Sequence, residues 1–80
     1  MGWFFNNDKD ASEIQSKIRD LEREYDYLQS QISDAKKKWW EHRFVNADME
    51  EAEYWRRLED KYIDKQYYVR EKIRNLEAKL

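Results

Sequence analysis

The chain has 80 residues, with 18 acidic residues against 16 Lys and Arg residues, no cysteine and no proline. This length supports one small domain, and the lack of cysteine excludes disulfides and thiolate metal sites. A net charge of −2 argues against a dedicated binder of nucleic acid or anionic membranes, and an aromatic content of 16% argues against a disordered chain.

An aromatic arm over residues 1–9 comes first, and its composition differs from that of the rest of the chain. It carries a run of three large aromatic residues, Trp3, Phe4 and Phe5. A helix is expected to begin directly after it, because Asp10 can cap a helix and Glu13 can complete a capping box. We expect the arm to fold back onto the open end of the helices near Leu76 and Leu80 or to pack within an assembly, to enter a groove on a partner protein, or to touch a membrane interface.

A heptad pattern then predicts one long helix over residues 10–45. Its apolar positions are separated alternately by four and three residues: Ile14, Ile18, Leu21, Tyr25, Leu28, Ile32, Ala35 and Trp39. This spacing places them on one stripe of the helix, as in a coiled coil. Beyond Trp39 the same register gives mainly polar residues, so the stripe ends there.

A turn at about residues 45–48 separates this helix from a second one over residues 49–80. Asn46 and Asp48 are good N-caps, and Asp48 with Glu51 makes a second capping box. The second helix repeats the heptad stripe, with Glu59 and Gln66 at two of its positions and apolar residues at the others: Ala52, Trp55, Tyr62, Val69, Ile73, Leu76 and Leu80.

The two stripes match if the chain folds back on itself at the turn, with paired residue numbers adding to 94. The matched pairs include Ile14 with Leu80, Ile18 with Leu76, Leu21 with Ile73, and Trp39 with Trp55. We therefore predict an all-α fold, an antiparallel two-helix hairpin of coiled-coil type over residues 10–80, which assembles into a four-helix bundle or docks on a partner. One continuous helix of about 70 residues is the rival architecture.

Two layers of this pairing are polar on one side, Leu28 opposite Gln66 and Ala35 opposite Glu59. Two explanations are open. The second helix rotates so that Leu58 and Ile63 enter the seam, or a polar layer fixes the register at some cost in stability.

Aromatic residues outside the stripe predict a binding surface, because two helices cannot cover them all. The expected anchors are Trp40, Phe44 and Tyr54 with the arm, and the expected orienting cations are Lys37, Lys38, Arg56 and Arg57. The plainer interpretation is a solvated face, with tyrosine hydroxyls in water and charges of both signs.

The groups needed for catalysis or metal binding are missing from the sequence. His42 is the single histidine and has no acidic residue three positions before it, so the Glu-x-x-His metal pattern is absent. Two helices offer no enclosed site, and there is no glycine-rich phosphate loop. We expect no enzymatic activity, no metal and no cofactor.

In length and in the tryptophans near the expected turn, the chain resembles the small secreted helical hairpins of the WXG type. The stretch from Tyr67 to Glu71 also has the spacing of their Tyr-x-x-x-Asp/Glu tail signal. The defining Trp-x-Gly is missing, since residues 39–42 contain no glycine, and no function is carried over.

The expected function is a non-enzymatic protein–protein interaction or assembly module, as a homodimer or in a hetero-complex. The alternatives are a small inhibitor of the phage type, which blocks a host or effector protein with the acidic face around Glu50, Glu51 and Glu53, or a peripheral membrane or nucleic-acid binder. No signal peptide and no apolar stretch of about 20 residues is visible, so a cytoplasmic location is expected.

Overall fold

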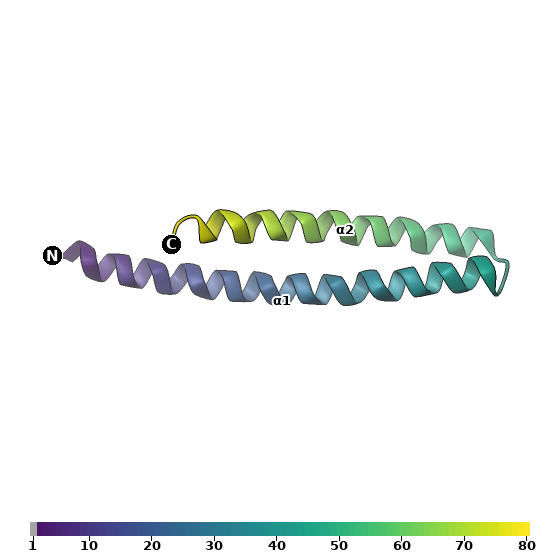
Figure 1. The fold of residues 1–80 in the computed structure, drawn as a ribbon, viewed down its shortest axis with the longest axis horizontal. Coiled ribbons are helices and arrows are strands. Elements are labelled where there is room, and N and C mark those ends of the chain that lie inside the picture. Colours follow the sequence, from purple (N-terminus) through teal and green to yellow (C-terminus); the bar gives the residue numbers. More distant parts are fainter. Residues whose placement is uncertain (1) are drawn as a thin grey trace.

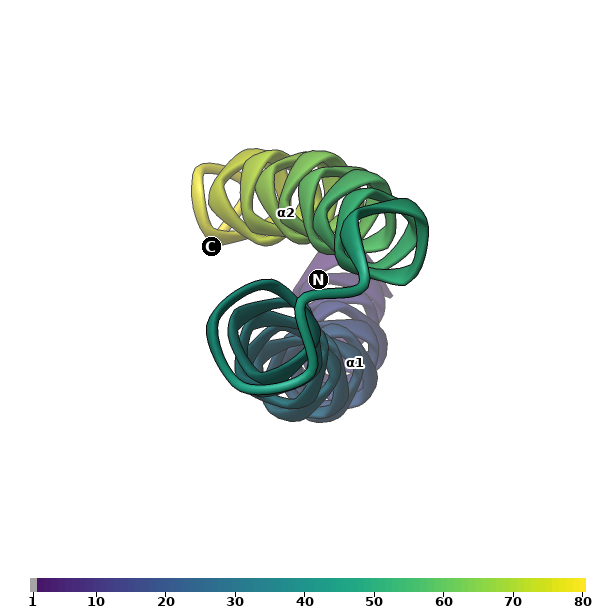
Figure 2. The ribbon, with the colours of Figure 1, turned by 90° about the vertical axis from the view of Figure 1, so that its right-hand side faces the viewer.

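The protein is described by a computed structural model, which places the backbone of residues 2–80 and the side chains of residues 10–80. Two antiparallel helices lie side by side along their length, α1 (Gly2–Phe44) and α2 (Met49–Glu77) (Figure 1). The molecule is a rod with extents of 67 × 14 × 11 Å. Seen from the turn end, α2 passes from one side of α1 to the other, as the heptad spacing requires (Figure 2). The predicted all-α hairpin is confirmed.

The start of α1 differs from the prediction. The helix begins at Gly2, so Asp10 and Glu13 lie in its interior and do not cap it. No proline or glycine interrupts residues 3–10, and each residue added to an existing helix gains a hydrogen bond without a new nucleation cost. The backbone of the predicted arm is therefore continuous with α1, and the side chains of Trp3, Phe4 and Phe5 lie outside the described ones.

The turn occupies residues 45–48, where its capping residues indicated it. Asp48 has an extended backbone, and its Oδ1 accepts a hydrogen bond from the Glu51 amide at 3.3 Å, which satisfies one free donor at the start of α2. Ala47 has a φ of 55°, in the left-handed region. The Asp48 amide donates to the His42 carbonyl at 2.7 Å, so the turn is tied back to the last turn of α1.

The core is the predicted seam between the two stripes. Among residues 10–80, six are buried, and all of them are stripe positions: Ile18, Leu28, Ile32, Ala35, Ala52 and Val69. The contacts across the seam keep the predicted register, since Gln29–Gln66, Lys38–Trp55 and Trp39–Arg56 have residue numbers that add to 95, 93 and 95. The hairpin is thus held by one narrow apolar line.

Both polar layers are kept in the seam. The Gln66 Nε2 donates to Gln29 Oε1 at 2.8 Å and to the Tyr25 carbonyl at 3.4 Å, and the Trp39 Nε1 donates to Glu59 Oε2 at 3.4 Å. Ile63 remains 44% exposed, so α2 has not rotated to bring it into the seam. The structure supports the second of the two explanations, in which polar residues occupy seam positions and bond across them.

At the end of the hairpin away from the turn, the pairing of the two helices stops earlier than predicted. The helix α2 ends at Glu77, and the amides of Lys79 and Leu80 donate to the carbonyls of Leu76 and Glu77 in a tight final turn. Leu80 is therefore 60% exposed and does not form the predicted layer with Ile14. The first turns of α1 extend past this end of α2 (Figure 1).

Candidate functional site

The residues beside the seam fall on two flanks of the hairpin, because in an antiparallel pair the same heptad positions of both helices share a side. One flank, here called the Arg56 flank, carries Lys36, Arg43, Met49, Arg56, Ile63 and Arg70. The other, called the Lys72 flank, carries Lys17, Lys38, Leu58, Lys65 and Lys72. The structure agrees, since Arg43, Met49 and Arg56 line one surface hollow and Lys17 and Lys72 line another.

An aromatic–basic patch lies on α1 next to the Arg56 flank. It consists of five residues near the turn: Lys36, Lys37, Trp40, Arg43 and Phe44. The Trp40 and Phe44 rings pack with their centroids 5.2 Å apart, yet the two residues remain 53% and 60% exposed. The Arg43 guanidinium lies 5.3 Å from the centroid of the Phe44 ring, a cation–π contact that holds the ring toward the flank.

A surface hollow of about 410 Å³ lies on the Arg56 flank near the turn. Its lining includes the small, buried Ala52 and the exposed Met49, with Glu53, Arg56 and Asp60 at the rim. An alanine at this seam position leaves room beside Trp39 that a larger residue would fill. The hollow therefore has apolar and charged walls in similar measure, with Arg56 and Arg57 as well as Glu53 and Asp60 among its lining residues.

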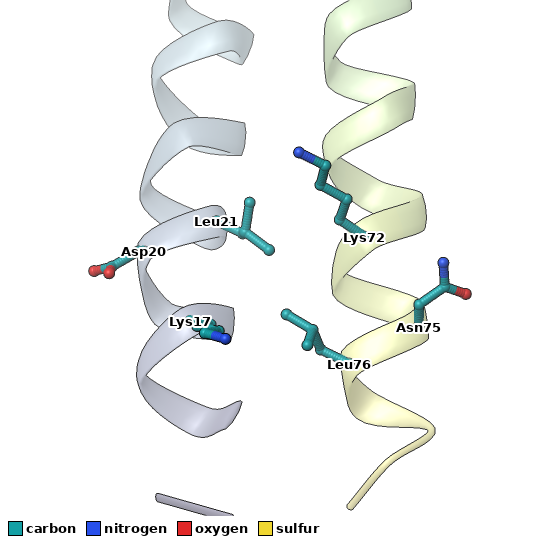
Figure 3. A pocket seen from close by; sticks show the side chains of 6 residues that line it. All are labelled: Lys17, Asp20, Leu21, Lys72, Asn75 and Leu76. Carbon is teal, nitrogen blue, oxygen red and sulfur yellow. The ribbon is translucent and has the colours of Figure 1, made fainter. Parts of the chain in front are cut away.

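The second hollow, about 450 Å³, lies on the Lys72 flank toward the open end of the hairpin. Figure 3 shows Leu21 and Leu76 pointing toward one another from the two helices, with Asp20 directed away from the gap. Lys17 and Lys72 line the same hollow, and the Lys72 ammonium is 4.6 Å from the centroid of the Tyr68 ring. This hollow lies where the Leu21 and Leu76 layer of the seam opens onto the Lys72 flank, and the basic residues Lys17 and Lys72 line it as well.

The exposed apolar residues differ in kind between the two sides. Those near the Arg56 flank include four without a hydroxyl group, Trp40, Phe44, Met49 and Ile63. Those on the outer surface next to the Lys72 flank are tyrosines, Tyr27, Tyr54 and Tyr68. A tyrosine can cover apolar surface and keep its hydroxyl in water, and Trp40 can do the same with its indole N–H, whereas Phe44, Met49 and Ile63 gain only from burial. The Arg56 flank is thus the side with more to gain from a partner.

The predicted binding residues are divided by the structure rather than brought together. Trp40, Phe44 and Lys37 share the aromatic–basic patch. Tyr54 packs edge-on against Trp55, with ring centroids 5.3 Å apart, and Lys38 lies 4.3 Å from the Trp55 ring centroid on the Lys72 flank. These two residues therefore belong to the other side of the hairpin.

The two predicted cations of α2 already have partners within the chain. The Arg57 guanidinium bonds to the Glu53 carboxylate at 2.9 Å, and Arg56 lies 6.0 Å from the centroid of the Trp39 ring. Both cations are exposed, so each contact contributes no more than about 1 kcal/mol. A partner can displace them at small cost.

Most of the Arg56 flank was missing from the predicted binding set, including Arg43, Met49, Ile63 and Arg70. The signal that would have found them is the heptad position just beside the seam, which repeats every seven residues as Met49, Arg56, Ile63 and Arg70. Counting aromatic residues alone does not reveal it.

Within the described residues, no group of three or more His, Asp or Glu side chains is placed to hold a metal ion. Neither helix, over the part that the structure describes, is apolar enough over a sufficient length to cross a bilayer. Comparison of the chain with protein-family models, curated proteins and solved structures gave no match.

Proposed function

We propose that this chain is a non-enzymatic protein–protein interaction module, which presents the aromatic–basic patch and the Arg56 flank to another protein chain. The observation that carries the proposal is the Trp40–Phe44 pair, whose rings pack on each other while more than half of each residue's surface stays in solvent. Aromatic side chains are the preferred anchors of protein interfaces, because they bury much area while losing little conformational freedom.

The surroundings of the pair support the same proposal. Full burial of one large apolar side chain is worth roughly 1.5–3 kcal/mol, so two adjacent rings offer a partner a substantial gain. Lys36, Lys37 and Arg43 lie around the rings and outnumber Glu41, the acidic residue that lines the same surface hollow as Trp40. Such charges at the rim attract acidic groups and orient a partner during encounter.

Photo-cross-linking tests the proposal directly. A photo-reactive phenylalanine analogue replaces Phe44, and the chain is irradiated in the cells that produce it. We expect a discrete protein adduct, formed with this chain or with a different protein. The matched control carries the analogue at Arg23, which is exposed on the other half of α1. Adducts equal to those of the control would overturn the proposal.

The identity of the adduct separates the two forms of the function. An adduct with one foreign protein in a fixed ratio would favour an inhibitor or adaptor. An adduct with a second copy would favour an assembly module.

The substitution Trp40→Ala is expected to weaken association by at least about tenfold, since anchor residues carry about 2 kcal/mol or more. The helix content from circular dichroism should stay unchanged, because Trp40 lies outside the seam. Tyr27→Ala is the control, as Tyr27 is equally exposed but lies on the opposite side of α1. Unfolding of the Trp40→Ala chain would show that Trp40 belongs to the core, which would contradict the proposal.

A further inference from the structure

We propose that the Arg56 flank binds an acidic amphipathic helix of a different protein, which lies along the hairpin as the third helix of a bundle. This inference rests on the proposed function, because it names the chemistry of the partner that the flank and the aromatic–basic patch bind. Three observations carry it: two cations at one level of the flank, the heptad spacing of the residues along it, and the exposed apolar side chains between its cations.

Near the turn, the two helices bring cations to the same level of the flank. Because paired stripe positions have numbers that add to about 94, Lys36 of α1 comes level with residue 58 of α2. Arg56 is two residues from that level, or about 3 Å of helix rise. Flanking positions of paired helices often carry opposite charges, and the same counting brings Glu22 beside Arg70 further from the turn. The Lys36 and Arg56 level has no such acid, and a carboxylate of a partner can take its place.

The acidic residues next to this level leave both cations accessible to a partner. The Glu53 carboxylate is bonded to Arg57 at 2.9 Å. Asp60 lines the same hollow as Arg56, but among the described side chains neither Arg56 nor Lys36 forms an ion pair. An acid from outside therefore gains two cations at one level without breaking an ion pair of the hairpin.

The spacing along the flank fits a helix. Arg43 follows Lys36 after seven residues, and Arg56, Ile63 and Arg70 repeat at the same interval, which is about 10.5 Å of helix rise. A helix packed along the flank also presents a side chain to it every seven residues, so acids at that interval meet successive cations. Phosphates along a strand of duplex nucleic acid follow one another at about 3.4 Å, so most of them would find no cation. The spacing favours a protein helix over a nucleic acid.

Apolar side chains separate the cations along the same line. Met49 and Ile63 lie on either side of Arg56 in the heptad repeat, and both are exposed. The Trp40 and Phe44 rings add exposed apolar surface at the edge of the flank. A wholly polar acidic chain would leave these side chains in water, whereas a helix with an apolar stripe beside its acids would bury them. The pattern therefore favours an amphipathic partner.

The flanks of a second copy of this chain do not have this chemistry. The Lys72 flank is mainly basic as well, with Lys17, Lys38, Lys65 and Lys72. Either flank of a second copy would thus bring like charge to Lys36 and Arg56, which is unfavourable in an interface. The complementary helix is therefore expected on a different protein.

Two synthetic peptides are the probes for this inference. Each is about 20 residues long, enough for nearly three heptads, and has leucine at the two stripe positions of every heptad. One peptide carries glutamate at the positions that flank the stripe, and the other carries lysine there. Fluorescence anisotropy of the labelled peptides should show at least about tenfold tighter binding of the glutamate peptide to the unmodified chain. Equal binding of the two peptides, or tighter binding of a single-stranded oligonucleotide, would overturn the inference.

Charge reversal at one level shows whether this preference comes from the Arg56 flank. In the variant Lys36→Glu with Arg56→Glu, the lysine peptide should bind more tightly than the glutamate peptide, and helix content from circular dichroism should confirm that the variant folds. Lys65→Glu with Lys72→Glu, on the Lys72 flank, is the matched control and should keep the original preference. A preference that stays unchanged in the first variant, or that reverses equally in the control, would overturn the inference.

Photo-cross-linking separates this inference from the proposed function. With the analogue at Phe44, the variant Lys36→Glu with Arg56→Glu should lose the foreign adduct that the otherwise unmodified chain forms. If that adduct persists, or if the adduct is a second copy, the acidic helix is excluded and the binding function stands. If neither chain forms a specific adduct, the binding function is excluded and the inference falls with it.

Discussion

Ala47 is the one described residue other than glycine with a positive φ, and it lies in the turn that sets the register of the hairpin. An L-amino acid with a side chain loses roughly 1–2 kcal/mol in this conformation, whereas glycine adopts it freely but gives up more entropy on folding. Ala47→Gly should therefore raise the free energy of unfolding by about 0.5 kcal/mol, measured by urea denaturation.

Ala78→Gly is the matched control for this change, because Ala78 ends α2 with a φ of −65° and gains nothing from glycine. We expect it to leave stability unchanged or to lower it slightly. A loss of stability in Ala47→Gly as large as in the control would contradict the left-handed conformation of the turn.

At the scale of the elements, the polar layer around Gln66 is expected to lower the stability of the hairpin while fixing the register of its two helices. Gln66→Leu removes the hydrogen bonds to Gln29 and Tyr25 and adds apolar contact at a half-buried seam position. We expect about 1 kcal/mol of added stability and a less unique pairing of the helices. Spin labels at Asp20 and Asn75, which line one hollow across the seam, should then report a second or broader distance.

Gln31→Leu is the control for this prediction, because it adds the same side chain at a half-buried position outside the Gln66 layer. Its labels should keep a single distance. A Gln66→Leu chain that is less stable than the parent would show that the polar layer contributes stability as well as register.

The elements differ in how far the sequence alone predicts them. The seam and the turn could be predicted, because heptad spacing and an Asp48 N-cap are local signals that tertiary packing reinforces. The start of α1 could not be predicted. The capping box at Asp10 indicates a helix start there, but the preceding residues can also be helical, and in the structure the helix begins at Gly2. The structure distributes the predicted binding set over two sides of the hairpin, because neighbours in sequence such as Lys37 and Lys38 lie about 100° apart on a helix.

At the scale of the whole molecule, α1 has 43 residues and α2 has 29. The paired part of the rod ends near Lys17 and Leu76, where the last hollow of the seam lies. On the N-terminal side of Lys17, α1 continues past the end of α2 (Figure 1). One helix is thus supported by its neighbour over most of its length and, within the described chain, by its own hydrogen bonds at the N-terminal end.

This unequal length gives α1 a gradient of hydrogen exchange. Isolated helices shorter than about 12–15 residues are marginal in water, so amides of residues 10–16 should exchange through local fraying, while those of residues 26–32 should exchange only when the hairpin opens. Exchange followed by NMR should show the first group many times faster than the second. Uniform protection along α1 would contradict this expectation. Any molecule that covers the unpaired N-terminal part of α1 would then slow amide exchange there first. Exchange in this part of the helix therefore reports binding at that end of the rod.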